Sequence, residues 1–263
     1  MSRSLPDRSA GRWDRPSRGR FDKVAALDIY RLEAMVVRAR NRLYFRLHRK
    51  DDRERRKVFV AGHPRSGTKS IHKLFVRNGL KSLHFPGNWN TRKFDCFSDR
   101  GNYQPLRLMS DYYVNGFFVL NTRPTYKYIR SAMNHWFGRG RKSSGWFEPS
   151  VRNIQNEILA RNRFFMDFVR DFGDRANFLV VNIEREGAFD FLCGHLGLEA
   201  ADPHRESSKD WDTQHLAKID QAFADLGIEE TRMEPFVNPH LVGEEDGAVY
   251  QAFLDKHADR IFL

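Results

Sequence analysis

The strongest chemical signal in the sequence is a short loop bounded by glycines. Residues 62–70 are Gly-His-Pro-Arg-Ser-Gly-Thr-Lys-Ser, and they follow the apolar stretch at 58–61. Between a buried strand and a helix, the backbone N–H groups of such a loop converge and can bind a phosphate-like anion. Gly67 lets the chain approach that anion closely. The side chains that add positive charge or hydroxyl donors are Arg65, Ser66, Thr68, Lys69 and Ser70.

The spacing separates this loop from the P-loop of nucleotide triphosphatases. That motif is GxxxxGK[ST], with the lysine directly after the second glycine. Gly62 and Gly67 have the required spacing, but Thr68 stands where the lysine belongs and Lys69 comes one residue later. One residue turns a helix by about 100°, so Lys69 cannot replace the P-loop lysine. A small-molecule kinase, which would need Mg²⁺, is therefore an alternative and not the first interpretation.

A second candidate anion contact follows another apolar stretch. Arg123 comes directly after the strand predicted at 116–122, and Ser131 lies eight residues later in the helix that Pro124 is predicted to open. A guanidinium can donate two parallel hydrogen bonds to a phosphate. Ser131, two helical turns along, can face the same anion.

Together the two motifs resemble those of the sulfotransferases that use 3′-phosphoadenosine 5′-phosphosulfate (PAPS). The segment Pro64-Arg-Ser-Gly-Thr68 resembles their 5′-phosphosulfate loop, and Arg123 with Ser131 resembles their 3′-phosphate site. The likeness extends over about residues 57–200. It implies PAPS as the donor, no metal, and transfer of a sulfuryl group to a hydroxyl of a carbohydrate or lipid-linked acceptor.

The resemblance also implies roles for the catalytic candidates. Arg65 would neutralise the leaving phosphate, because a guanidinium is too basic to act as an acid. One branch of the family has a catalytic glutamate at the position that Ser82 occupies here. We therefore expect His84 as the base first, and Asp99 or Asp95 next. Because this glutamate is missing, the alternative that the chain is a non-catalytic binding protein with the same fold stays open.

Alternating strands and helices are predicted to position these residues. Apolar runs predict strands at 57–62, 82–85, 116–122 and 177–183. Helices are predicted at 68–78, 104–113, 124–136, 150–173, 186–196, 212–226 and 245–260, and loops at 86–102 and 138–148. This order predicts an α/β, three-layer P-loop-like fold, with a mostly parallel central sheet flanked by helices.

The positive charge is concentrated at the N-terminal end. Of the 263 residues, 1–57 contain 18 Lys or Arg and 8 Asp or Glu, whereas the remainder contains 27 and 26. This distribution argues against a nucleic-acid-binding protein as a whole. We expect a disordered basic arm at 1–22, a basic amphipathic helix and linker at 23–56, and a sulfotransferase domain at 57–263.

The amphipathic helix has two interpretations. Apolar residues recur at roughly helical spacing with four arginines between them: Val24, Leu27, Leu32, Met35, Val36, Ala39, Leu43 and Leu47, with Arg38, Arg40, Arg42 and Arg46. We expect the helix to pack against the main domain, and the alternative is peripheral contact with a membrane. The sequence has no apolar run of about 20 residues and no apolar core of a secretory signal, so we expect a cytoplasmic protein.

Overall fold

The computed structural model describes most of the chain from residue 53 onward. The described ranges are 53–63, 65–84, 93–99, 106–137, 150–199, 213–225 and 229–263, together with Val36, Ala39, Leu43 and Leu47. The basic arm predicted at 1–22 and the loop predicted at 138–148 lie outside these ranges.

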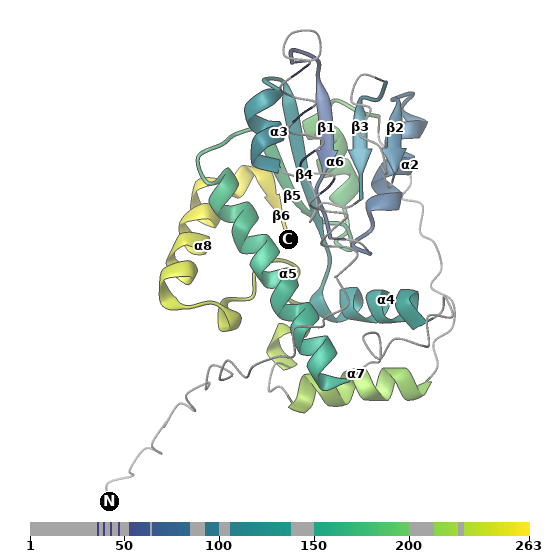
Figure 1. Cartoon of the computed structure of the whole chain (residues 1–263), viewed down its shortest axis with the longest axis vertical. Helices are drawn as coiled ribbons and strands as arrows, with labels where there is room; N and C mark the ends of the chain where they lie inside the picture. Colours follow the sequence, from purple (N-terminus) through teal and green to yellow (C-terminus); the bar gives the residue numbers. More distant parts are fainter. Residues whose placement is uncertain are drawn as a thin grey trace, which may run out of the picture.

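The centre of the fold is a six-stranded sheet in which all described pairs are parallel. The strands are β1 (Lys57–Val60), β2 (Ser82–His84), β3 (Cys96–Ser98), β4 (Gly116–Thr122), β5 (Phe178–Asn182) and β6 (Ile261–Phe262). Their order is β2-β3-β1-β4-β5-β6 (Figure 1). The α/β class with a parallel sheet is therefore confirmed. Because the strands are parallel, their carboxyl ends share one edge, where such sheets bind ligands.

The helices lie where the sequence predicts them, with boundaries that differ by a few residues. They are α2 (Thr68–Arg77), α3 (Leu106–Tyr112), α4 (Thr125–Phe137), α5 (Val151–Phe172), α6 (Ala188–Leu196), α7 (Thr213–Asp225) and α8 (Glu244–Lys256). The cap of α5 is Ser150, whose side chain accepts a hydrogen bond from the Asn153 N–H. α6 ends at Gly197, which has a left-handed φ of 66°. Both are ordinary start and stop signals of helices.

Strand β3 corrects the prediction that residues 86–102 are mostly loop. Its three residues pair with β1 on one side and with β2 on the other. Phe97 is fully buried and stacks on Phe59 with 5.3 Å between the ring centroids. A strand of three residues is too short to show a periodic pattern, and turn-forming residues surround it in the sequence. Tertiary pairing therefore forms this strand.

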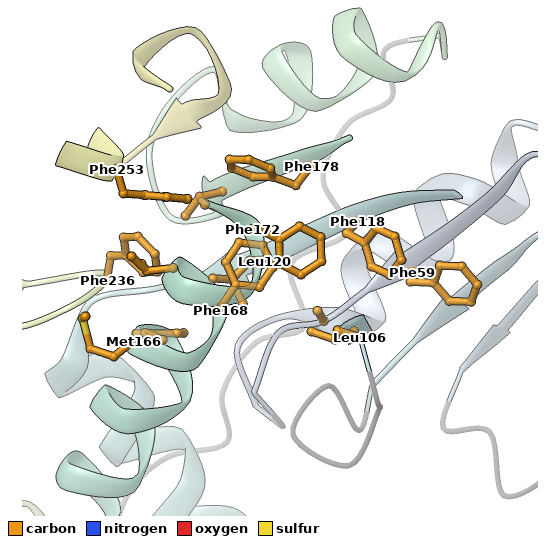
Figure 2. Close-up of a cluster of buried hydrophobic side chains, with 14 of the residues drawn as sticks. Phe59, Leu106, Phe118, Leu120, Met166, Phe168, Phe172, Phe178, Phe236 and Phe253 are labelled. Atoms are coloured by element: carbon orange, nitrogen blue, oxygen red, sulfur yellow. The ribbon is translucent and has the colours of Figure 1, made fainter. Parts of the chain in front are cut away.

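Side chains alternate along each strand and build two separate apolar layers. On one face Phe59, Phe118 and Phe178 pack against α3, α5 and α8 (Figure 2). In the same layer Phe168 and Phe172 of α5 stack with 4.4 Å between ring centroids. On the other face the valines of β1 pack against α2 and α6. The sheet thus forms the middle of three layers.

A third apolar cluster supports the carboxyl edge of the sheet. It joins the buried faces of α4, α7 and the first half of α5, through residues such as Ile129, Ile158 and Phe223. Figure 1 shows α4 and α7 beyond the ends of the strands. This cluster fixes the direction of α4, the helix that contains Ser131.

Of the helix predicted within residues 23–56, the structure describes only Val36, Ala39, Leu43 and Leu47, so the packing of the whole helix stays a prediction. Val36, Leu43 and Leu47 are helical, but their side chains are 59%, 57% and 69% exposed. They therefore do not pack against the α/β body. None of the helices in the described ranges combines the length and the apolar character needed to cross a membrane.

Candidate functional site

The loop after β1 is held in shape by hydrogen bonds to itself and to β4. The N–H and the Oγ of Ser66 both donate to the carbonyl oxygen of His63, at 3.0 and 2.5 Å. The side-chain amide of Asn121 donates to Ser66 O at 2.6 Å and to Ser66 Oγ at 2.8 Å. The hydroxyl of Ser66 therefore maintains the shape of the loop. The sequence analysis instead expects this hydroxyl to donate a hydrogen bond to the bound anion.

Close packing explains both glycines of the motif. A Cβ at Gly62 would lie 1.8 Å from Oδ1 of Asn121, far closer than van der Waals contact allows. A Cβ at Gly67 would lie 1.9 Å from Cδ1 of Ile183, and Gly67 also has a φ of 90°. At position 67 the left-handed φ adds to this contact as a reason for glycine, because L side chains rarely adopt it, whereas Cδ1 of Ile183 is the movable end of a side chain.

Two candidate catalytic residues have strained backbones. Arg65 and Asp99 each have a φ of 74°, and they are the only non-glycine residues with positive φ in the described ranges. An L-residue in this conformation costs about 1–2 kcal/mol. Such strain concentrates at functional sites, where the surrounding structure maintains it. Both residues follow the carboxyl end of a strand, β1 and β3 respectively.

The two predicted anion contacts meet in space. Nη1 of Arg123 donates to the carbonyl oxygen of Arg65 at 3.1 Å, so the residue after β4 holds the loop after β1. Nε of Arg65 lies 3.3 Å from Oγ of Ser131 on α4. Arg123 and Ser131 lie 58 and 66 positions after Arg65 in the sequence. The three residues nevertheless form one cluster, as their motifs predict.

Two members of this cluster were not predicted from the sequence. One oxygen of Glu184 accepts from Nη2 of Arg123 at 2.5 Å, and the other accepts from Nζ of Lys127 at 3.0 Å. Burial lowers the pKa of Arg123 and Glu184 opposes that shift, so the guanidinium remains charged. The sequence offers one possible signal for Lys127, which lies four residues after Arg123 and in the first turn of α4.

The cluster combines the three cations of Arg65, Arg123 and Lys127 with the carboxylate of Glu184. This excess of positive charge suits a doubly charged anion. Within the cluster, the buried Nε of Arg123 has no hydrogen-bond partner in the described structure, and as an N–H donor it suits an anion. Such atoms are rare in folded proteins, and a bound ion or water is one of the explanations for them.

The first turn of α2 faces the same edge of the sheet. Within the described part of the chain no side chain caps this helix, and its first turn contains no acidic residue. Its N-terminus is therefore suited to an anion. Of the predicted loop donors, Arg65 and Lys69 are exposed and Ser70 is half-buried, whereas Ser66 and Thr68 are buried.

The candidate bases lie at the ends of the two neighbouring strands. Nε2 of His84 is 4.0 Å from Oδ2 of Asp99, and Nδ1 of His84 is 3.0 Å from Oγ of Ser98. The ring of His72 stacks on His84 with 5.4 Å between centroids, and its Nδ1 is 2.8 Å from Oγ of Ser82. The structure thus brings His84 and Asp99 together at the edge where the loop lies.

Asp95 does not belong to this site. It precedes β3, so it lies at the amino edge of the sheet, opposite the ends that hold Asp99 and the loop. Its Oδ2 there is 3.4 Å from the Lys81 N–H. The interpretation of Asp95 as an alternative base is therefore wrong, and the cause is the undetected strand β3.

A buried polar network lies behind the loop. Oη of Tyr128 on α4 is 2.8 Å from Nδ1 of His63 and donates its proton to Glu157 on α5. A tyrosine hydroxyl has one proton, so the hydrogen bond between the two rings is donated by Nδ1 of His63. Burial lowers the pKa of His63, although Glu157 opposes the shift.

Arg161 on α5 fixes the turn that contains Arg123. Its Nη1 donates to Thr125 Oγ1 at 2.8 Å, and its Nη2 donates to the carbonyl oxygens of Arg123 at 2.6 Å and Pro235 at 2.7 Å. Burial lowers the pKa of this guanidinium to about 10, which leaves it charged at neutral pH. The cation cluster thus rests on a further, buried arginine.

The lowered pKa of His63 predicts a loss of stability in acid. Below its ordinary value of 6.5 the unfolded chain binds a proton at His63 that the folded chain does not bind. The stability that the fold gains from uncharged His63 is therefore fully present above pH 6.5, and it is lost as the pH falls below that value. We expect His63→Asn to reduce the slope of unfolding free energy against pH by up to about 1.4 kcal/mol per unit. Urea denaturation between pH 7.5 and 5, in steps of about half a unit, measures this slope, and identical slopes would contradict the assignment.

Comparison of the chain with protein-family models gives no match, and comparison with curated proteins gives none either. The residues of the site and their geometry are therefore the basis on which a function is inferred.

Proposed function

We propose that this protein is a sulfotransferase that moves a sulfuryl group from PAPS to a hydroxyl group. The observation that carries the proposal is the contact of Arg65 with both Arg123 and Ser131. These residues come from the two motifs that resemble the 5′-phosphosulfate and 3′-phosphate sites of the family. Their meeting at the carboxyl edge of a parallel sheet supports a single site for a bisphosphorylated nucleotide.

Each contact of the donor has a candidate residue in this arrangement. The 5′-phosphosulfate would bind at the loop, where Arg65, Lys69 and the N-terminus of α2 supply positive charge. The 3′-phosphate would bind Arg123 and Ser131, with Lys127 adding charge. Glu184 keeps Arg123 and Lys127 adjacent by binding one with each oxygen.

The proposed reaction forms one bond and breaks another. The acceptor oxygen attacks sulfur, the bond from sulfur to the phosphate oxygen breaks, and adenosine 3′,5′-bisphosphate leaves. Arg65 stabilises the charge that develops on the leaving phosphate. The hydroxyl proton passes to His84, whose imidazolium the carboxylate of Asp99 then stabilises across 4.0 Å.

A transfer assay in the absence of free metal tests the proposal. The protein is incubated with sulfur-labelled PAPS, EDTA and a panel of carbohydrate and lipid-linked alcohols. We expect label on a hydroxyl acceptor and release of adenosine 3′,5′-bisphosphate, because no step uses a metal. Label transferred only from γ-labelled ATP, and only with Mg²⁺, would replace the proposal by a small-molecule kinase. Binding of the nucleotide without any transfer would indicate a non-catalytic protein of the same fold.

A further inference from the structure

A buried tyrosine joins the loop after β1 to α4, and the proposed reaction gives it no role. Tyr128 lies three residues before Ser131 on α4 and is only 1% exposed. Its Oη is 2.8 Å from Nδ1 of His63, the residue that follows Gly62 in the loop. The contact between Arg65 and Ser131 joins the same two elements at the surface. The loop and α4 are therefore linked on a buried side as well as on an exposed side.

The groups around this buried link restrict its movement. The His63 ring meets the Tyr128 ring edge to face, with 5.3 Å between centroids and an interplanar angle of 81°. It meets Phe164 of α5 in the same way, at 5.5 Å and 78°. The guanidinium of Arg161 lies over the Tyr128 ring, 5.4 Å from its centroid, and Glu157 accepts a hydrogen bond from the Tyr128 hydroxyl. The loop, α4 and α5 thus enclose the hydrogen bond between the two rings.

The hydroxyl of Tyr128 is the acceptor that this arrangement needs. Its single proton is donated to Glu157, so Nδ1 of His63 donates to the phenol oxygen. Without the hydroxyl, this buried N–H would lose its acceptor in Tyr128. A buried donor that loses its acceptor costs more free energy than the hydrogen bond itself contributes. We therefore expect the loop to shift at His63 when the hydroxyl is removed.

A shift at His63 would reach the donor contacts directly. The carbonyl oxygen of His63 accepts hydrogen bonds from the N–H and the Oγ of Ser66, so His63 holds the loop on both sides of Arg65. Arg65 has a φ of 74°, and such a conformation persists only while the surrounding structure maintains it. Its Nε lies 3.3 Å from Oγ of Ser131, and its carbonyl oxygen accepts from Nη1 of Arg123. The geometry of the cation cluster thus depends on the position of His63.

We propose that Tyr128 is a positioning residue of the donor site, an inference that rests on the proposed function. Tyr128 acts through His63, because it is buried behind the loop. Its hydroxyl holds the loop where Arg65 and Ser131 can bind the same bisphosphorylated nucleotide. The donor then meets groups that are already in place, and less of the binding energy is used to order the loop.

Two tyrosines of α4 allow a matched test on the full chain. Tyr128→Phe removes the hydroxyl and retains the ring. We expect it to weaken the binding of adenosine 3′,5′-bisphosphate at least about tenfold in a calorimetric titration. Tyr126→Phe makes the same change two residues away, where the hydroxyl donates to Asp220 of α7 at 2.9 Å. Each variant loses a buried or half-buried hydroxyl, but only Tyr128→Phe should lose affinity.

Variants of His63 test whether Tyr128 acts through this residue. His63→Leu removes the donor to Tyr128 and should weaken binding by a similar factor. Because both substitutions break one link, His63→Leu combined with Tyr128→Phe should bring no further loss. His63→Asn restores an N–H donor and should recover part of the affinity. If Tyr128 had only a structural role, these variants would differ in stability and bind the nucleotide equally well.

Hydrogen exchange of the free protein gives a second readout that needs no nucleotide. We expect the amides of residues 65–70 to exchange at least about tenfold faster in Tyr128→Phe than in the wild type, and at the wild-type rate in Tyr126→Phe. If this pattern is found in a protein that binds no bisphosphate, the proposed function fails while Tyr128 still positions the loop. Unchanged exchange in Tyr128→Phe, or unchanged affinity in a protein that binds the nucleotide, would overturn the inference.

Discussion

Arg123→Ala is expected to weaken the binding of adenosine 3′,5′-bisphosphate by a factor of about 100 or more. Hydrogen bonds to charged groups contribute about 1.5–3 kcal/mol each, and a bidentate guanidinium makes two of them. The substitution also removes the contact from Nη1 to the carbonyl oxygen of Arg65, which supports a strained residue. Calorimetric titration of wild type and variant measures the ratio of their dissociation constants.

Two further variants give this comparison its controls. Arg123→Lys retains the charge without the planar fork, so its affinity should fall between those of the other two proteins. Arg170→Ala removes an arginine from the last turn of α5, where it pairs with Asp167 and Asp246. It should leave the affinity unchanged. Equal weakening by Arg170→Ala would attribute the effect to net charge and contradict the assigned contact.

Gly62→Ala is expected to destabilise the fold by about 3 kcal/mol or more, at the upper end of overpacking effects. The added methyl group would meet the side chain of Asn121 at 1.8 Å. Asn121 cannot move without breaking its two hydrogen bonds to Ser66. The loop and the strand that fastens it should therefore both be disturbed. Urea denaturation measures the difference in unfolding free energy.

Gly194→Ala is the matched control for this substitution. Gly194 lies within α6, and a Cβ added there would meet no atom of the described structure within 4 Å. Replacing a helical glycine by alanine with free space is expected to stabilise by up to about 1 kcal/mol. If Gly62→Ala were as stable as Gly194→Ala, the tight packing between the loop and β4 would be refuted.

Local sequence signals were sufficient for most of the fold. The runs at β1, β4 and β5 are long and apolar enough to identify buried strands, and Gly197 marks the end of α6. β3 has three residues among turn-forming residues and β6 has two residues, so neither gives an apolar run that marks a strand. These two strands form because they pair with neighbouring strands. The residues that determine this pairing are far apart in the sequence.

In the candidate site, too, some residues could be predicted from local motifs and others could not. Arg65, Arg123 and Ser131 could be predicted because each belongs to a short motif next to a strand end. Glu184 was missed because its partners lie 57 and 61 residues away, and nothing near it marks the contact. The network of His63, Tyr128 and Glu157 joins three separate elements and has no local signal.

Backbone strain could not be predicted from the residue types. A positive φ is expected at glycine, and it is uncommon at arginine and aspartate. Arg65 and Asp99 nevertheless stand out once their φ values are known. Both are candidates for the chemistry on independent grounds, which gives the strained conformations a functional interpretation.

The proposed function requires that the carboxyl edge of the sheet binds a 3′,5′-bisphosphorylated nucleotide without metal. A calorimetric titration of the wild-type protein with adenosine 3′,5′-bisphosphate in EDTA, beside a titration with ATP and Mg²⁺, decides whether it does. We expect saturable binding of the bisphosphate and no heat of binding with ATP and Mg²⁺. Binding of ATP and Mg²⁺ alone, or of neither nucleotide, would contradict the assignment of this edge as a PAPS site.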